Sequence, residues 1–285
     1  MPPANSSESR AGTDFAGDTA ADSASARRDP FVQTERIQHP AWDAFPALSR
    51  ATEPRFLRTT DFMTPSGTPH NDQKREQLRA QIGSLVFEAC RDEKGVHAPS
   101  ALCALGALSG FAVQMGLRQK LVVEEGQPET KVFAVVSTKS GETYYFGPLF
   151  DEFLLSTGEG KISVWAIVAG GAQRAGAKGL PNLRVIAEKN AHDVGTPAYG
   201  RMPEVAGCTP KETPLGSLRR HWPAVRKLLE ESDTPPATWG WEIAVVAQAA
   251  IIGCATVVEP ELAAALVMTP AISMSKIDPK RVLTV

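Results

Sequence analysis

The chain has 285 residues, of which 42% are hydrophobic and 22% are charged, and its formal net charge is −2. This length and apolar content suffice for one large or two modest domains with a real hydrophobic core. A charge so close to zero leaves no basic footprint, so we expect neither nucleic acid nor a membrane surface as a partner. The four cysteines form no Cys-x-x-Cys pair and have no histidine at zinc-finger spacing. We therefore expect no metal site and no cofactor, and a reducing cytoplasm as the compartment.

The N-terminal region divides into two parts. Residues 1–30 are mostly Ser, Ala, Asp and Gly, and they predict a disordered tail because they offer little apolar surface to offset the entropy of ordering. They contain no apolar run long enough for a signal peptide. Residues 31–71 combine several prolines with aromatic residues such as Trp42 and Phe45. The prolines exclude a long helix or a central strand, and the aromatic residues favour an arm packed on the domain over a plain linker.

One globular domain is expected over residues 72–276, followed by a C-terminal tail over residues 277–285. Residues 72–92 have helical spacing, with Leu78, Ile82 and Leu85 on one face. This segment should be an amphipathic surface helix.

A second helix is predicted over residues 100–118, where a strip of small residues includes Gly106 and Gly110. Glycine costs about 1 kcal/mol relative to alanine inside a helix. Two glycines four positions apart therefore indicate that another backbone packs very close, although merely tolerated glycines would give the same pattern.

The spacing of apolar residues then changes from helical to alternating. Residues 121–124, 131–137 and 142–146 predict three short strands, separated by turn residues. They should form a small antiparallel sheet that is covered by other elements, because so small a sheet is not stable alone.

The following segments return to helical spacing. Residues 162–175 predict a helix, although residues 162–168 alone would also fit a buried strand. Residues 215–231 predict a helix interrupted by Pro223.

The most apolar stretch of the chain runs from Ile243 to Val267 and carries no charge before Glu259. It predicts two buried helices, the second ending at Thr269-Pro270. The charge-free run is shorter than the roughly 20 residues of a membrane span, so we expect a core helix. The fold class is thus α+β, predominantly α-helical, with helices packed around this C-terminal helix pair.

The loop over residues 195–213 is the best candidate for chemistry. It is rich in proline and glycine and has no periodicity, and long loops inside compact domains are often functional. Cys208 is the one cysteine outside an apolar run, and a histidine beside it would activate the thiol. The candidate catalytic residues are Cys208, His192 and His221, although sequence alone does not place them together.

Aromatic and cationic residues in and after this loop are candidates for ligand binding, but simple packing explains the aromatic ones equally well. These candidates are Tyr199, Arg201, Trp222, Trp239 and Trp241. Glu242 directly precedes the charge-free run, and if it is buried it needs a partner or a raised pKa.

Two functional hypotheses follow. The first is a non-enzymatic cytosolic protein that binds a protein partner or a small ligand. The second is a small-molecule enzyme, a thiol- or histidine-based transferase or hydrolase, that uses the loop over residues 195–213. No motif decides between them.

Overall fold

A computed structural model of the chain describes residues 69–157 and 161–283. The predicted disordered tail, and all but the last residues of the predicted arm, lie outside these ranges. The elements in chain order are α2 (Pro69–Ala89), β1 (Arg91–Asp92), β2 (Gly95–Val96), α3 (Ala98–Leu117), η2 (Arg118–Glu124), α4 (Glu129–Val132), β3 (Ala134–Ser137), β4 (Thr143–Phe146), α5 (Pro148–Leu155), α6 (Val164–Arg174), α7 (Leu183–His192), α8 (Pro214–Glu231), η3 (Pro236–Thr238), α9 (Trp239–Gly253), α10 (Pro260–Met274) and α11 (Lys280–Leu283). The predominantly helical α+β class is confirmed.

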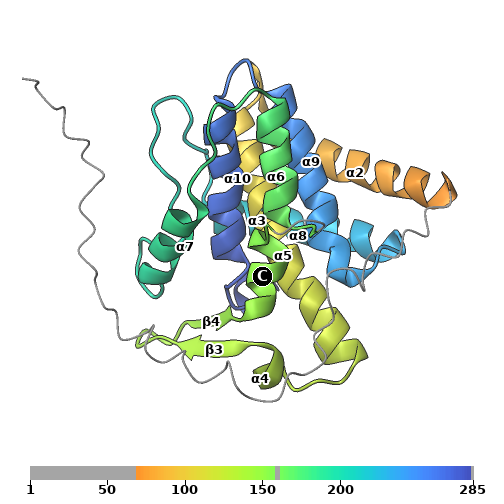
Figure 1. The fold of residues 1–285 in the computed structure, drawn as a ribbon, viewed down its shortest axis with the longest axis vertical. Coiled ribbons are helices and arrows are strands. Elements are labelled where there is room, and N and C mark those ends of the chain that lie inside the picture. The colour runs from red at the N-terminus through yellow and green to blue at the C-terminus, as the bar shows by residue number, and fades with distance from the viewer. Residues whose placement is uncertain (1–68, 158–160, 284–285) are drawn as a thin grey trace, which may run out of the picture. The chain divides into compact units, whose positions relative to one another are not determined.

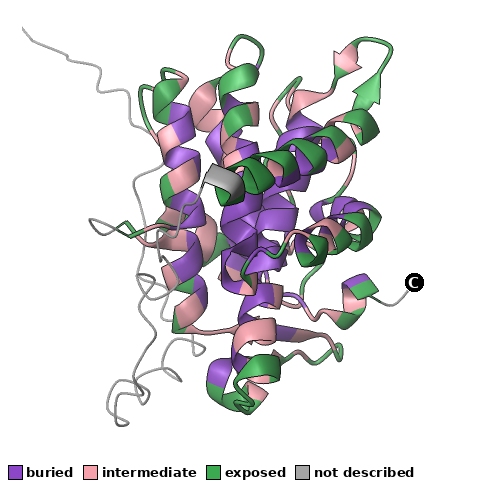
Figure 2. Cartoon of the chain, turned by 90° about the vertical axis from the view of Figure 1, so that its right-hand side faces the viewer, coloured by how far each residue is buried: buried purple, intermediate pink, exposed green. Residues whose placement is uncertain are grey.

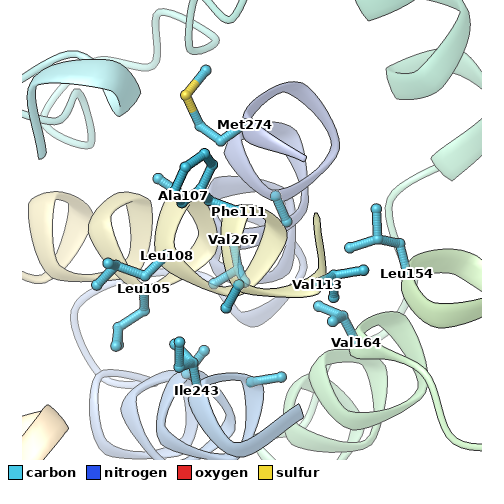
Figure 3. Packing of buried hydrophobic residues seen from close by; sticks show 14 of the residues in the cluster. Leu105, Ala107, Leu108, Phe111, Val113, Leu154, Val164, Ile243, Val267 and Met274 are labelled. Atoms are coloured by element: carbon cyan, nitrogen blue, oxygen red, sulfur yellow. The ribbon is translucent and has the colours of Figure 1, made fainter. Parts of the chain in front are cut away.

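Helix α3 lies at the centre of the core. Of its twenty residues, only Ala98 and Met115 are not buried. Helices α9 and α10 pack on α3 far more extensively than on each other, and side chains from several surrounding helices converge on α3 in Figure 3. The expected arrangement around the C-terminal pair is therefore wrong in one respect: α9 and α10 flank the centre, and α3 occupies it.

The small residues of α3 explain this arrangement. A Cβ placed on Gly106 would lie 2.8 Å from the Val267 carbonyl carbon, and one on Gly110 would lie 2.6 Å from the Ala271 carbonyl carbon. The two glycines thus admit the backbone of α10, which runs beside α3 (Figure 1). The predicted close backbone approach at these glycines is confirmed.

Among the described residues, the sheet is smaller than expected. Strands β3 and β4 form a two-stranded antiparallel hairpin that pairs Ala134 with Phe146 and Ser137 with Thr143. The strand predicted over residues 121–124 is instead the π-helix η2. It follows α3 without a break, since Arg118 at the junction has right-handed helical dihedrals. A second antiparallel hairpin joins β1 and β2.

Two helices continue through proline. Helix α8 passes Pro223, where the sequence predicted an interruption, and α10 passes Pro270, where it predicted an end. At Pro270 the neighbouring helix explains the difference. A Cβ on Gly106 would lie 2.8 Å from the Pro270 Cγ, so the proline ring packs into the space that this glycine leaves. The lost backbone hydrogen bond is thereby offset by packing.

The remaining segments match or extend the prediction. Residues 164–174 form a helix, α6, whose N-cap Ser163 accepts a hydrogen bond from the Ala166 amide. The C-terminal segment packs on the domain: Ile277 is 1% exposed and bridges to Tyr144, and α11 contacts α8. All described residues belong to one compact unit.

One helical segment of the described residues, Ala98–Glu124, is long and apolar enough to cross a membrane. However, 94% of its most apolar window is buried by the rest of the protein. Central helices of globular cores have the same character.

Candidate functional site

The predicted catalytic residues occupy three different surroundings. Cys208 is half-buried in the loop between α7 and α8, and His192 is exposed at the end of α7. His221 is 3% exposed within α8, where burial, followed by the charge of Arg220, lowers its pKa. Among the hydrogen bonds of the described residues, none joins Cys208 to His221. Among the described residues, the structure therefore shows no hydrogen bond through which His221 would activate this thiol.

Most of the predicted binding residues contact other parts of the protein and are not free for a ligand. Trp239 and Trp241 are each 5% exposed, and their indole N–H groups donate to the carbonyl oxygens of Thr234 and Phe153. Trp222 is fully buried. These indoles are packed mainly in the core.

The two loop residues among the candidates also bond within the protein. The hydroxyl of Tyr199 donates to the Ser273 carbonyl at 2.7 Å, and burial raises the pKa of that hydroxyl well above its usual value. The exposed Arg201 donates to the Pro197 carbonyl, four residues before it. The loop is therefore fastened to α10 rather than open around these side chains.

A groove between α2, the start of α3 and α9 has the character of a ligand site. Its volume is about 760 Å³. We call it the α2–α9 groove and define it by its small lining residues Ala80, Gly83, Ser84, Ala249, Ala250 and Gly253, with Phe87 and Val246 among the larger ones. Ligand sites of drug-sized molecules are concave, mostly apolar and about 300–1,000 Å³ in volume. The groove meets each of these conditions.

The outer edge of this groove carries exposed apolar side chains. Val96 and Val257 line it and are 38% and 70% exposed. Exposed apolar surface gathered in a concave region typically marks a binding site, whereas single apolar residues on a surface do not. Figure 2 shows α2 as a largely exposed helix that crosses in front of buried segments.

One end of the groove is closed by a charged cluster. Glu242 is fully buried in the first turns of α9, and α2 supplies two arginines that contact it. Arg75 donates to Oε1 from Nε, at 2.8 Å, and from Nη2. Arg79 donates from Nε to Oε2 at 2.7 Å. The partner that the sequence required for a buried Glu242 is thus a pair of guanidinium groups.

The groove was not predicted from the sequence. The outward residues of α9 were expected to be covered, because the charge-free run predicts burial on every side. In the structure Ala249 and Gly253 are exposed. One signal was available: Ala80, Gly83 and Ser84 place three small side chains on one stretch of α2. Small residues there leave room that larger side chains would fill.

The comparisons with known proteins return no relatives: no family model, no curated protein and no solved structure matches this chain. Within residues 69–157 and 161–283, no group of three or more His, Cys, Asp or Glu side chains is placed to hold a metal ion.

Proposed function

We propose that this protein is a non-enzymatic binding protein that takes a small apolar ligand into the α2–α9 groove. The observation that carries the proposal is the groove itself, an apolar recess of about 760 Å³ lined by small side chains between three helices. Burial of apolar ligand surface contributes about 25 cal/mol per Å², so such a recess supplies affinity without specific chemistry.

A small ligand fits the described surface better than a protein partner does. Stable protein interfaces bury about 800 Å² on each side and use exposed aromatic or arginine anchors. Here Phe87 in the groove is only partly exposed, Arg79 is paired with Glu242, and the groove edge exposes two valines. The tryptophans of the described residues are buried in the core. The recess is an open groove, so a small ligand would lie along it with one side facing water.

The test uses Nile red, an uncharged apolar dye whose fluorescence rises when it leaves water. We expect the full chain to bind the dye and Ala249→Trp to weaken binding by about tenfold or more, because the indole would occupy the groove from its exposed side. Ala224→Trp is the matched control, since Ala224 is also an exposed helical alanine but lies on α8. Equal binding by both variants, or no binding by the full chain, would overturn the proposal.

A further inference from the structure

The α2–α9 groove has a cationic group at one end and apolar walls along the rest, which restricts the chemistry of its ligand. Arg79 lines the groove and has 28% of its side chain exposed. Its Nε donates to Glu242, and among the described residues neither terminal nitrogen has a hydrogen-bond acceptor. A guanidinium in this position has two N–H-bearing nitrogens left to offer, which is the geometry that binds a carboxylate in a fork.

The charges near this end do not cancel inside the cluster. Two guanidinium groups, from Arg75 and Arg79, face the single carboxylate of Glu242. The cluster therefore has a formal charge of about +1, and low-dielectric walls strengthen its attraction for an anion. Glu76 also lines the groove, one turn before Ala80, and opposes that attraction. It is exposed, so water screens its charge more strongly than it screens the cluster.

We infer that the ligand is a free long-chain carboxylic acid. Its carboxylate accepts hydrogen bonds from the terminal nitrogens of Arg79, and its alkyl chain follows the small residues of the groove towards Val96 and Val257. The charge of the cluster and the apolar character of the walls complement the two ends of such a molecule. This inference rests on the proposed function, because it requires that the groove bind an apolar ligand at all.

The experiment compares dodecanoic acid with dodecanol as competitors of Nile red on the full chain at neutral pH. We expect the acid to bind about tenfold more tightly than the alcohol, as a charge-assisted hydrogen bond pair implies. Glu76→Gln should increase the preference for the acid by removing the opposing charge. The variant Arg79→Gln leaves Glu242 paired with Arg75. It therefore removes both the terminal nitrogens of Arg79 and the net charge of the cluster, and it should abolish the preference while Nile red still binds.

The outcomes separate the two proposals. If Nile red does not bind, or if Ala249→Trp binds it unchanged, the groove is not a ligand site and the proposed function fails. If acid and alcohol compete equally, the groove binds apolar molecules and only the inference about the carboxylate fails. Arg79→Lys should retain part of the preference for the acid, which a purely structural role of Arg79 would not require. Co-sedimentation with phosphatidylglycerol vesicles without uptake of free acid would also overturn the inference.

Discussion

The close contact between α3 and α10 provides the sharpest test of the fold, through the substitution Gly110→Ala. The added Cβ would lie 2.6 Å from the Ala271 carbonyl carbon and 2.7 Å from the Ala271 Cα. Carbon atoms normally approach no closer than about 3.5 Å, and the Ala271 carbonyl oxygen lies closer still to the added Cβ, so the two helices must separate by at least about 0.9 Å. Neither neighbour is the end of a flexible side chain, so the backbone itself has to move.

The cost of that movement follows from the extent of the interface. A gap of about 0.5–1 Å forfeits a quarter to a half of the dispersion attraction between the facing atoms. Overpacking of a core costs about 1–3 kcal/mol and more where backbone must shift, while alanine regains about 1 kcal/mol of helix propensity. We expect a net loss of about 3 kcal/mol, because α3 and α10 form the largest helix contact of the described residues. At about 2–4 °C per kcal/mol for a domain of this size, Tm should fall by about 6–12 °C.

The measurement is urea unfolding followed by circular dichroism, with Gly170→Ala as the control. Gly170 lies within α6, and a Cβ there would be 3.6 Å from the Gln248 Nε2, an ordinary contact. The control should be neutral or stabilising by up to about 1 kcal/mol. If Gly110→Ala were as stable as Gly170→Ala, the two backbones would not be as close as described here and the reasoning would fail.

Three further predictions concern buried polar groups. Burial raises the pKa of Cys103 to about 12. Iodoacetamide should therefore not label this thiol in the native protein at mildly alkaline pH but should label it in urea. Equal labelling rates in the two conditions would contradict the burial of this thiol. Because burial lowers the pKa of His221, the unfolded state takes up a proton at higher pH than the folded state, and the free energy of unfolding should fall as the pH drops below about 6.5. Urea titrations across this range should show a shallower decline for His221→Gln, and an unchanged slope would count against the shift. Neither amide atom of the fully buried Gln114 has a hydrogen-bond partner among the described residues. Gln114→Leu should therefore stabilise the folded protein by about 1–2 kcal/mol. A loss of stability in thermal unfolding would contradict this.

Much of the local structure was predictable because it depends on short-range spacing. The amphipathic face of Leu78 and Ile82, the helix at residues 164–174 and the irregular loop after α7 follow from periodicity and from turn residues. The strand predicted over residues 121–124 failed because continuation of α3 outweighed the alternating pattern. Pro270 failed to end its helix because a partner glycine leaves room for its ring. In both cases the surrounding structure outweighed the local preference: the preceding helix at residues 121–124, and the packing of Gly106 against the ring at Pro270.

The sequence by itself determined that the chain forms a helix-rich core and that a buried Glu242 needs a partner, and it favoured a close backbone approach at Gly106 and Gly110. Each of these follows from the cost of exposing apolar surface, of placing glycine in a helix, or of burying a charge. Only the tertiary structure decided which backbone fills the glycine strip, which arginines neutralise Glu242, and that one side of α9 stays open beside α2. These are relations between residues more than a hundred positions apart, and the periodicity of a single segment carries no information about its distant neighbours.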